Sequence, residues 1–136
     1  MFYPAFIYKI DSGGYDGYFP DMEGCFFAGD TLDEAMKDAE KAFAQYAQVL
    51  TEQGLHVPAP KNPDSYIGDE RLVEDGGTLT LINLDPAKYE TKSVKFNLTM
   101  PGNLLAAIDN YIEDHGTYKN RSSFLAELAR KELTNH

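Results

Sequence analysis

The sequence of 136 residues predicts an α+β protein of two domains. Turn-bounded, β-rich segments fill its first thirty residues, and a helical spacing of apolar residues follows. Acidic charge is concentrated in residues 1–90, which hold 6 Lys/Arg and 17 Asp/Glu, whereas residues 91–136 hold 6 and 5. We therefore expect a β-β-β-α-β domain at 1–85, a linker at 86–92, and a strand-helix-helix domain at 93–134.

Three strands are predicted in the first thirty residues, at Phe2–Ile10, Tyr15–Phe19 and Cys25–Ala28. The residues between them, Asp11–Gly14 and Pro20–Gly24, are typical of turns. Such short connections favour antiparallel neighbours, so the sequence predicts a three-stranded antiparallel meander.

A helix of about 20 residues is predicted after Thr31, because apolar residues recur there every three or four positions. These residues are Leu32, Ala35, Met36, Ala39, Phe43, Tyr46 and Leu50. Thr31 and Glu34 form a capping-box pattern, and Gly54 is placed to end the helix. The outer face is mostly acidic, with Asp33, Glu34, Asp38 and Glu40.

A long connection rich in Pro, Gly and Asp occupies residues 55–77. Connections of this length in a compact domain are often functional or mobile. A fourth strand is predicted at Thr78–Leu84, and Asp85-Pro86 ends it.

The C-terminal part begins with a strand in which apolar and polar residues alternate from Val94 to Thr99. Two amphipathic helices follow, separated at Gly116, and the second is capped by Asn120 or Ser122. A lone strand needs a partner for its backbone groups, and about 45 residues make a marginal core. We therefore expect a homodimer, or a higher oligomer, in which two copies form an antiparallel ribbon.

In such a ribbon Lys95, Asn97 and Thr99 face outward, and the major groove of DNA admits a two-stranded ribbon. Asn120, Arg121 and Ser122 would then offer backbone N–H groups and a cation to phosphate. The alternative is an ordinary strand with solvated polar residues, followed by a helical hairpin. The formal net charge of −10 argues against nucleic-acid binding by the chain as a whole. The excess of acidic residues lies in residues 1–90, so this argument does not apply to residues 91–136.

The C-terminal part resembles the ribbon-helix-helix family of repressors. The resemblance rests on the run Val94-Lys95-Phe96-Asn97-Leu98-Thr99-Met100-Pro101, on Gly116 between two helices, and on Arg121-Ser122 at the second helix. It implies base contacts from Lys95, Asn97 and Thr99 and backbone contacts from Asn120, Arg121 and Ser122. Thr99 departs from the pattern, since ribbons of this type can carry a cation there.

The N-terminal part resembles the HicB antitoxin family. The shared motifs occur in order as Tyr3-Pro4-Ala5, Gly14-Tyr15, Phe19-Pro20-Asp21-Met22-Glu23-Gly24-Cys25 and Gly29-Asp30-Thr31-Leu32-Asp33-Glu34-Ala35. The resemblance implies a partial ribonuclease-H-like domain that neutralises a HicA-type toxin, a small basic ribonuclease that cleaves mRNA. It also implies that the antitoxin binds operator DNA and represses its own operon.

An acidic domain suits a partner whose RNA-binding surface is cationic. Asp21, Glu23, Asp33 and Asp38 are the candidate toxin contacts. For each of them the alternative is an ordinary solvated acidic face.

The composition limits other classes. No apolar run is long enough to span a membrane, and the N-terminus lacks the features of a secretory signal, so we expect a cytoplasmic protein without a membrane role. Cys25 is the only cysteine, so no internal disulfide can form. No spacing of His and Cys matches a zinc site, and no cofactor is expected.

Three catalytic or nucleic-acid alternatives remain for the first domain, which we expect not to be an enzyme. Four carboxylates could hold two divalent ions for hydrolysis, namely Asp11, Asp16, Asp21 and Asp30. Cys25 could be a nucleophile, although a small buried apolar residue is the usual role. Five aromatic residues could stack on bases, although core packing is the usual role: Tyr15, Tyr18, Phe19, Phe26 and Phe27. A stand-alone transcriptional regulator with an acidic sensing domain is the alternative for the whole chain.

Overall fold

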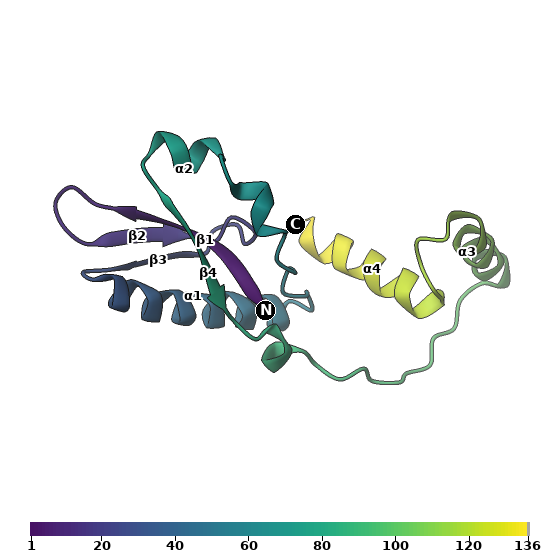
Figure 1. Cartoon of the computed structure of the whole chain (residues 1–136). Coiled ribbons are helices and arrows are strands. Elements are labelled where there is room, and N and C mark those ends of the chain that lie inside the picture. The colour runs from purple at the N-terminus through teal and green to yellow at the C-terminus, as the bar shows by residue number, and fades with distance from the viewer. Residues whose placement is uncertain (136) are drawn as a thin grey trace. The chain divides into compact units, whose positions relative to one another are not determined.

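The computed structural model describes residues 1–135 and divides the chain into two compact units between Thr91 and Lys92. Unit 1 is a four-stranded antiparallel sheet with a long helix (Figure 1). Its elements are β1 (Phe2–Lys9), β2 (Tyr15–Tyr18), β3 (Phe26–Gly29), α1 (Leu32–Glu52), η1 (Pro63–Tyr66), α2 (Glu70–Glu74), β4 (Thr78–Asn83) and η2 (Pro86–Tyr89). The predicted α+β class and the β-β-β-α-β order are confirmed, with short helices added in the connections.

The sheet has the strand order β3-β2-β1-β4. Phe6 of β1 lies opposite Tyr18 of β2 and Leu79 of β4, and Tyr18 lies opposite Phe26 of β3. The three N-terminal strands are therefore the predicted meander, and β4 adds at the free edge of β1. This register places four side chains from successive strands in one row on the same face of the sheet.

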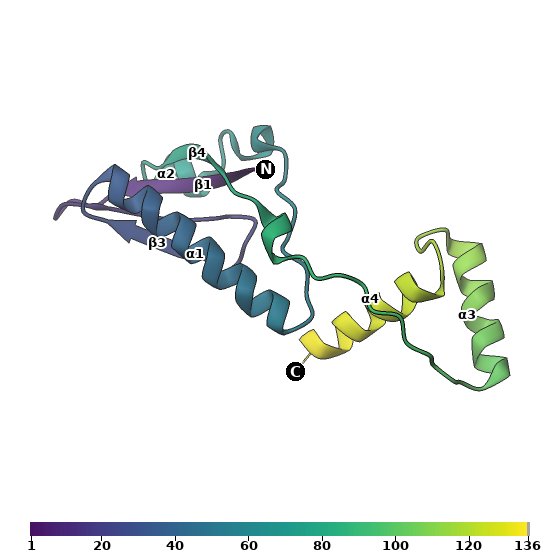
Figure 2. The ribbon, with the colours of Figure 1, turned by 90° about the horizontal axis from the view of Figure 1, so that it is seen from below.

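The inner face of the sheet carries the main core, and α1 packs against it (Figure 2). The helix contributes Ala35, Ala39, Phe43 and Ala47, spaced four residues apart. Small alanine side chains let the helix lie close to the strands. Leu32, which we expected on this face, is half exposed and is the first residue of the helix, before the first buried position, Ala35. The buried face of α1 therefore runs from Ala35 to Ala47 and does not include Leu32.

The start of α1 is fixed by its cap and by a close approach to β3. The Thr31 hydroxyl accepts a hydrogen bond from Glu34 N at 3.2 Å, and the Glu34 carboxylate accepts one from Asp30 N at 3.1 Å. The second bond therefore reaches the residue before the cap. A Cβ at Gly29 would collide with the backbone nitrogen of Ala35, so only glycine permits this packing.

The outer face of the sheet is covered in part by the connection between α1 and β4. Phe6, Tyr66 and Leu72 form a second, smaller buried cluster there. Tyr66 belongs to η1 and Leu72 to α2, and Figure 1 shows α2 on the side of the sheet away from α1. The long connection is therefore folded over the sheet.

The predicted linker at 86–92 differs from the structure over its first half. Pro86–Tyr89 forms the short helix η2, and the Tyr89 ring packs on Phe43 with 6.0 Å between centroids. The Tyr89 carbonyl also accepts a hydrogen bond from the Thr51 hydroxyl at 3.1 Å. These contacts tie η2 to α1, so the end of unit 1 lies beyond it.

Unit 2 contains α3 (Gly102–His115) and α4 (Arg121–Thr134). Gly116 ends α3 with a φ of 64°, as predicted from the sequence. Asn120 rather than Ser122 caps α4, since its side chain accepts a hydrogen bond from Ser123 N at 2.9 Å. Among the described residues of this unit, Ile108 is the only buried hydrophobic one.

Residues 91–101 form no hydrogen-bonded strand in the single chain. The predicted strand at 94–99 has no other strand within the described part of unit 2 with which to pair. Within residues 1–135 no helix has the length and apolar character needed to cross a membrane.

Candidate functional site

The segment before α3 exposes apolar and polar side chains in alternation. Val94, Phe96 and Leu98 are 83%, 78% and 58% exposed. Lys95, Asn97 and Thr99, the predicted base contacts, are also exposed. Exposure of the three apolar side chains to water is unfavourable. One side of this segment is therefore available for burial against another surface.

The N-terminus of α4 brings together the other predicted DNA contacts. Asn120 caps the helix with its side chain, and Ser122 is exposed in the first turn. The Arg121 guanidinium instead donates two hydrogen bonds to the Asp109 carboxylate, at 2.8 and 2.7 Å. This ion pair holds the pKa of Asp109 below its usual value. The charge of Arg121 is thus already balanced within the unit.

Asp21, one of the predicted toxin contacts, has a structural role. Its carboxylate accepts hydrogen bonds from the Tyr66 hydroxyl and, at 3.1 Å, from Lys61 N. Burial, together with the hydrogen bond to Asp21, raises the pKa of Tyr66 to about 12. Through these two bonds Asp21, in the turn after β2, holds the connection between α1 and β4 in place over the outer face.

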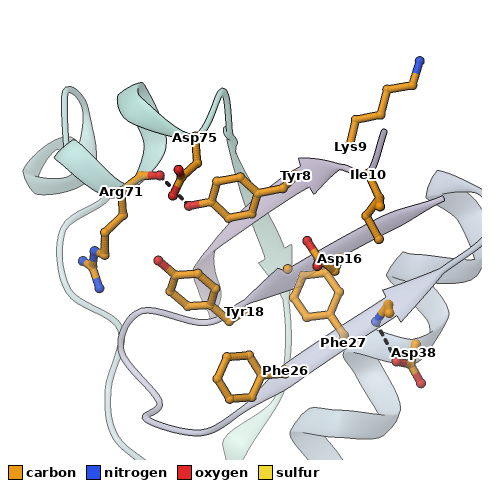
Figure 3. Close-up of a pocket in the computed structure, with 12 residues that line it drawn as sticks. Tyr8, Lys9, Ile10, Asp16, Tyr18, Phe26, Phe27, Asp38, Arg71 and Asp75 are labelled. Carbon is orange, nitrogen blue, oxygen red and sulfur yellow. Dashed lines mark hydrogen bonds between the residues drawn. The ribbon is translucent and has the colours of Figure 1, made fainter. Parts of the chain in front are cut away.

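Of the other predicted acidic contacts, Glu23 lies in the same turn as Asp21, and Asp33 and Asp38 lie on α1. Asp33 forms an exposed ion pair with Lys37 at 3.1 Å, and Glu23 is exposed in the turn before β3. Asp38 accepts a hydrogen bond from Ala28 N at 2.9 Å and so satisfies an edge group of β3 (Figure 3).

A groove of about 720 Å³ opens on the outer face beside α2 (Figure 3). We call it the outer groove and define it by six of its lining residues: Tyr8, Asp16, Tyr18, Phe26, Arg71 and Asp75. The Tyr18 ring lies 6.2 Å from Tyr8 and 6.0 Å from Phe26, between centroids. The Tyr8 hydroxyl donates to the Arg71 carbonyl at 2.8 Å, and burial raises the pKa of Tyr8.

The sequence offers Tyr18 and Phe26 as two of five possible base-stacking residues and does not distinguish them from the other three. The structure places Phe19 and Phe27 in the main core, with Tyr15 packed against it. Tyr18 and Phe26 lie on the opposite face, in the outer groove. The alternation of side chains along β2 and β3 was the signal that could have divided the two groups.

The catalytic alternatives receive no support from the geometry. Among residues 1–135 no group of three or more His, Cys, Asp or Glu side chains could hold a metal ion. Cys25 is buried, and burial raises the pKa of its thiol to about 11, which opposes formation of the nucleophilic thiolate.

Comparison with known proteins identifies relatives over nearly the whole chain. Residues 3–129 match the family model described as HicB_like antitoxin of bacterial toxin-antitoxin system. The chain is 37% identical over 133 residues to a 14.9 kDa protein of the rep-hol intergenic region of Haemophilus phage HP1, covering 98% of each.

Two solved structures are also similar. The antitoxin HicB3 is 56% identical, with 97% of each chain covered and a TM-score of 0.61. A chain of the HicA3 and HicB3 toxin-antitoxin complex is 49% identical, covering 63% of this chain and 100% of that one, with a TM-score of 0.57. The family match over residues 3–129 and the identity with HicB3 show that the chain belongs to the family of HicB-like antitoxins.

Proposed function

We propose that this chain is an antitoxin that binds and neutralises a HicA-type ribonuclease toxin through unit 1. The observation that carries the proposal is its 49% identity with a chain from a solved HicA3 and HicB3 complex. The charge of unit 1 supports it, because residues 1–90 carry a net −11. An acidic surface attracts a cationic RNA-binding enzyme and repels RNA from the same place.

The second part of the proposal is that unit 2 binds the DNA of its own operon as a ribbon-helix-helix dimer. Pairing of residues 94–99 from two copies would satisfy the backbone and bury Val94, Phe96 and Leu98. Lys95, Asn97 and Thr99 would then face the major groove, twice in each dimer. The described unit exposes these apolar residues, which supports a role for a second copy in covering them.

At the phosphates, the N-terminus of α4 is the proposed contact. Backbone N–H groups of the first turn, around Asn120 and Ser122, suit an anion. Arg121 is paired with Asp109 in the free unit, so the electrostatic attraction of each copy is modest. We therefore expect weak operator binding alone and tighter binding when a basic toxin offsets the acidic units.

Co-expression tests the proposal. A HicA-type toxin encoded beside this gene, or HicA3, would be induced with and without the full chain, and growth and operator repression would be measured together. Restored growth with repression is the expected result. Repression without rescue from either toxin would favour the stand-alone regulator, and rescue without repression would reject the DNA-binding part.

A further inference from the structure

The outer groove is the part of unit 1 that the fold leaves open. Tyr66 and Leu72 cover Phe6 on the outer face, but the aromatic row continues past them over β2 and β3. Phe26, at the end of that row, is 68% exposed although its cross-strand neighbour Tyr18 is half buried. A large exposed aromatic side chain at the rim of a groove is typical of a contact surface.

The same aromatic row already binds a guanidinium within the chain. The Arg71 guanidinium lies 5.1 Å from the centroid of the Phe6 ring and 6.0 Å from that of Tyr18. These distances fall within the range of cation–π attraction. The row thus has the chemistry to hold an arginine or lysine side chain, and Arg71 uses only its inner end.

Arg71 does not make the groove positive. Asp69 accepts two hydrogen bonds from its guanidinium, at 3.0 and 2.9 Å, and this pairing lowers the pKa of Asp69. Lys9 also lines the groove, but its side chain points away from the aromatic rings (Figure 3).

Two carboxylates remain to set the charge of the groove. Asp16 lies on β2, on the same face of the sheet as the aromatic row, and Asp75 follows α2 (Figure 3). Both are exposed, and among residues 1–135 neither has an ion pair within the chain. Asp38, the third lining carboxylate, is held by Ala28 N. The open part of the groove is therefore aromatic and acidic together.

A second unit 1 is a poor occupant, because two units that each carry a net −11 repel one another. Single-stranded nucleic acid could stack on the rings, but the carboxylates would repel its phosphates. We infer that the outer groove receives an arginine or lysine side chain of the cationic toxin, between the Tyr18 and Phe26 rings and the Asp16 carboxylate. This inference rests on the proposed function and assigns a place to the toxin contact.

The test compares groove variants of the full chain with matched controls. Asp16→Lys is paired with Asp11→Lys, which makes the same charge change at an exposed turn outside the groove. Phe26→Ser is paired with Phe2→Ser, since Phe2 is 60% exposed but does not line the groove. Affinity for the HicA-type toxin that the parent chain neutralises is measured by calorimetry, and circular dichroism checks the fold.

We expect each groove variant to weaken toxin binding roughly 10-fold or more and each control to change it by less than about 3-fold. Asp16 is exposed, so Asp16→Lys decides the matter even where Phe26→Ser unfolds the sheet. If the parent binds toxin and Asp16→Lys binds it equally well, the groove assignment is wrong while the antitoxin function stands. If the parent binds no toxin, the proposed function itself fails. A variant that binds toxin normally but changes the mass of the free chain would assign the groove to a second copy.

Discussion

Arg121, the first residue of α4, holds Asp109 of α3 in a two-pronged ion pair with N–O distances of 2.8 and 2.7 Å. Asp109 lies next to Ile108, the buried residue of this unit. The pair links the two helices and at the same time neutralises the cation nearest the proposed phosphate contact. Two roles proposed for one side chain, helix pairing and DNA attraction, therefore compete.

Asp109→Asn tests this competition. Removing the carboxylate charge frees the Arg121 guanidinium, so we expect operator affinity to rise a few-fold at low salt, and its salt dependence to steepen by about one ion per site. Asp114→Asn, the same charge change on an exposed position of α3, is the control. Salt titrations of a gel-shift assay measure both, and equal behaviour of the two variants would contradict the competition.

Tyr66→Phe is expected to destabilise unit 1 by about 1–3 kcal/mol, because it leaves the Asp21 carboxylate without its hydroxyl donor. The pKa of Tyr66 is raised to about 12, so this stabilisation is complete below the ordinary tyrosine pKa near 10 and is lost as the pH rises through about 12. Urea unfolding of parent and variant should therefore converge between pH 10 and 12. The difference in unfolding free energy between parent and Tyr66→Phe at pH 7 is the reference for this convergence, and a difference that stays constant up to pH 12 would contradict it.

Asn97→Ala is expected to abolish specific operator binding while toxin neutralisation stays at the parental level. The physical reason is that an asparagine amide pairs with an adenine edge and alanine cannot. Asn110→Ala, at an exposed position of α3, serves as the control. Unchanged operator affinity of Asn97→Ala in a gel-shift assay would reject the ribbon assignment.

Phe96→Asp is expected to shift the chain from dimer to monomer, since a carboxylate would have to be buried in the shared core of the proposed ribbon. Lys95→Asp, one residue away on the outward side, should remain a dimer and lose only DNA affinity. Sedimentation equilibrium gives the masses. Equal masses for the two variants would mean that residues 94–99 do not pair between copies.

A fragment of residues 1–91 is expected to fold and to bind the toxin, because unit 1 contains its own core and a net charge of −11 within residues 1–90. Circular dichroism first establishes that the fragment is folded, and co-purification with the toxin then measures binding. A folded fragment that fails to co-purify would show that unit 2 takes part in neutralisation.

Much of the secondary structure could be predicted because its causes are local. The turns between the first strands, the Thr31 cap and the left-handed Gly116 each depend on neighbours a few residues away. The exact buried face of α1 was harder to predict, since Leu32 has the right spacing but is half exposed in the structure. The sequence offers both Asn120 and Ser122 as the cap of α4, and the structure shows that Asn120 is the cap.

The roles of the candidate site residues likewise depended on contacts that are not local in the sequence. Asp21 looked like a surface carboxylate in a turn, and only the fold showed that Tyr66, 45 residues away in the chain, binds it. Arg121 looked like a free cation, and only the packing of α3 against α4 brought Asp109 to it. Contacts between distant residues depend on tertiary packing, which no local pattern reports.

The sequence by itself determined the two-part organisation, the separation of charge, the order of strands and helices, and the alternation at residues 94–99. These properties follow from composition and from periodicity along the chain. The tertiary structure alone decided which aromatic side chains fill the core and which line the outer groove, because that depends on the face each strand turns toward α1. It also decided which charges are already paired and which remain for a partner.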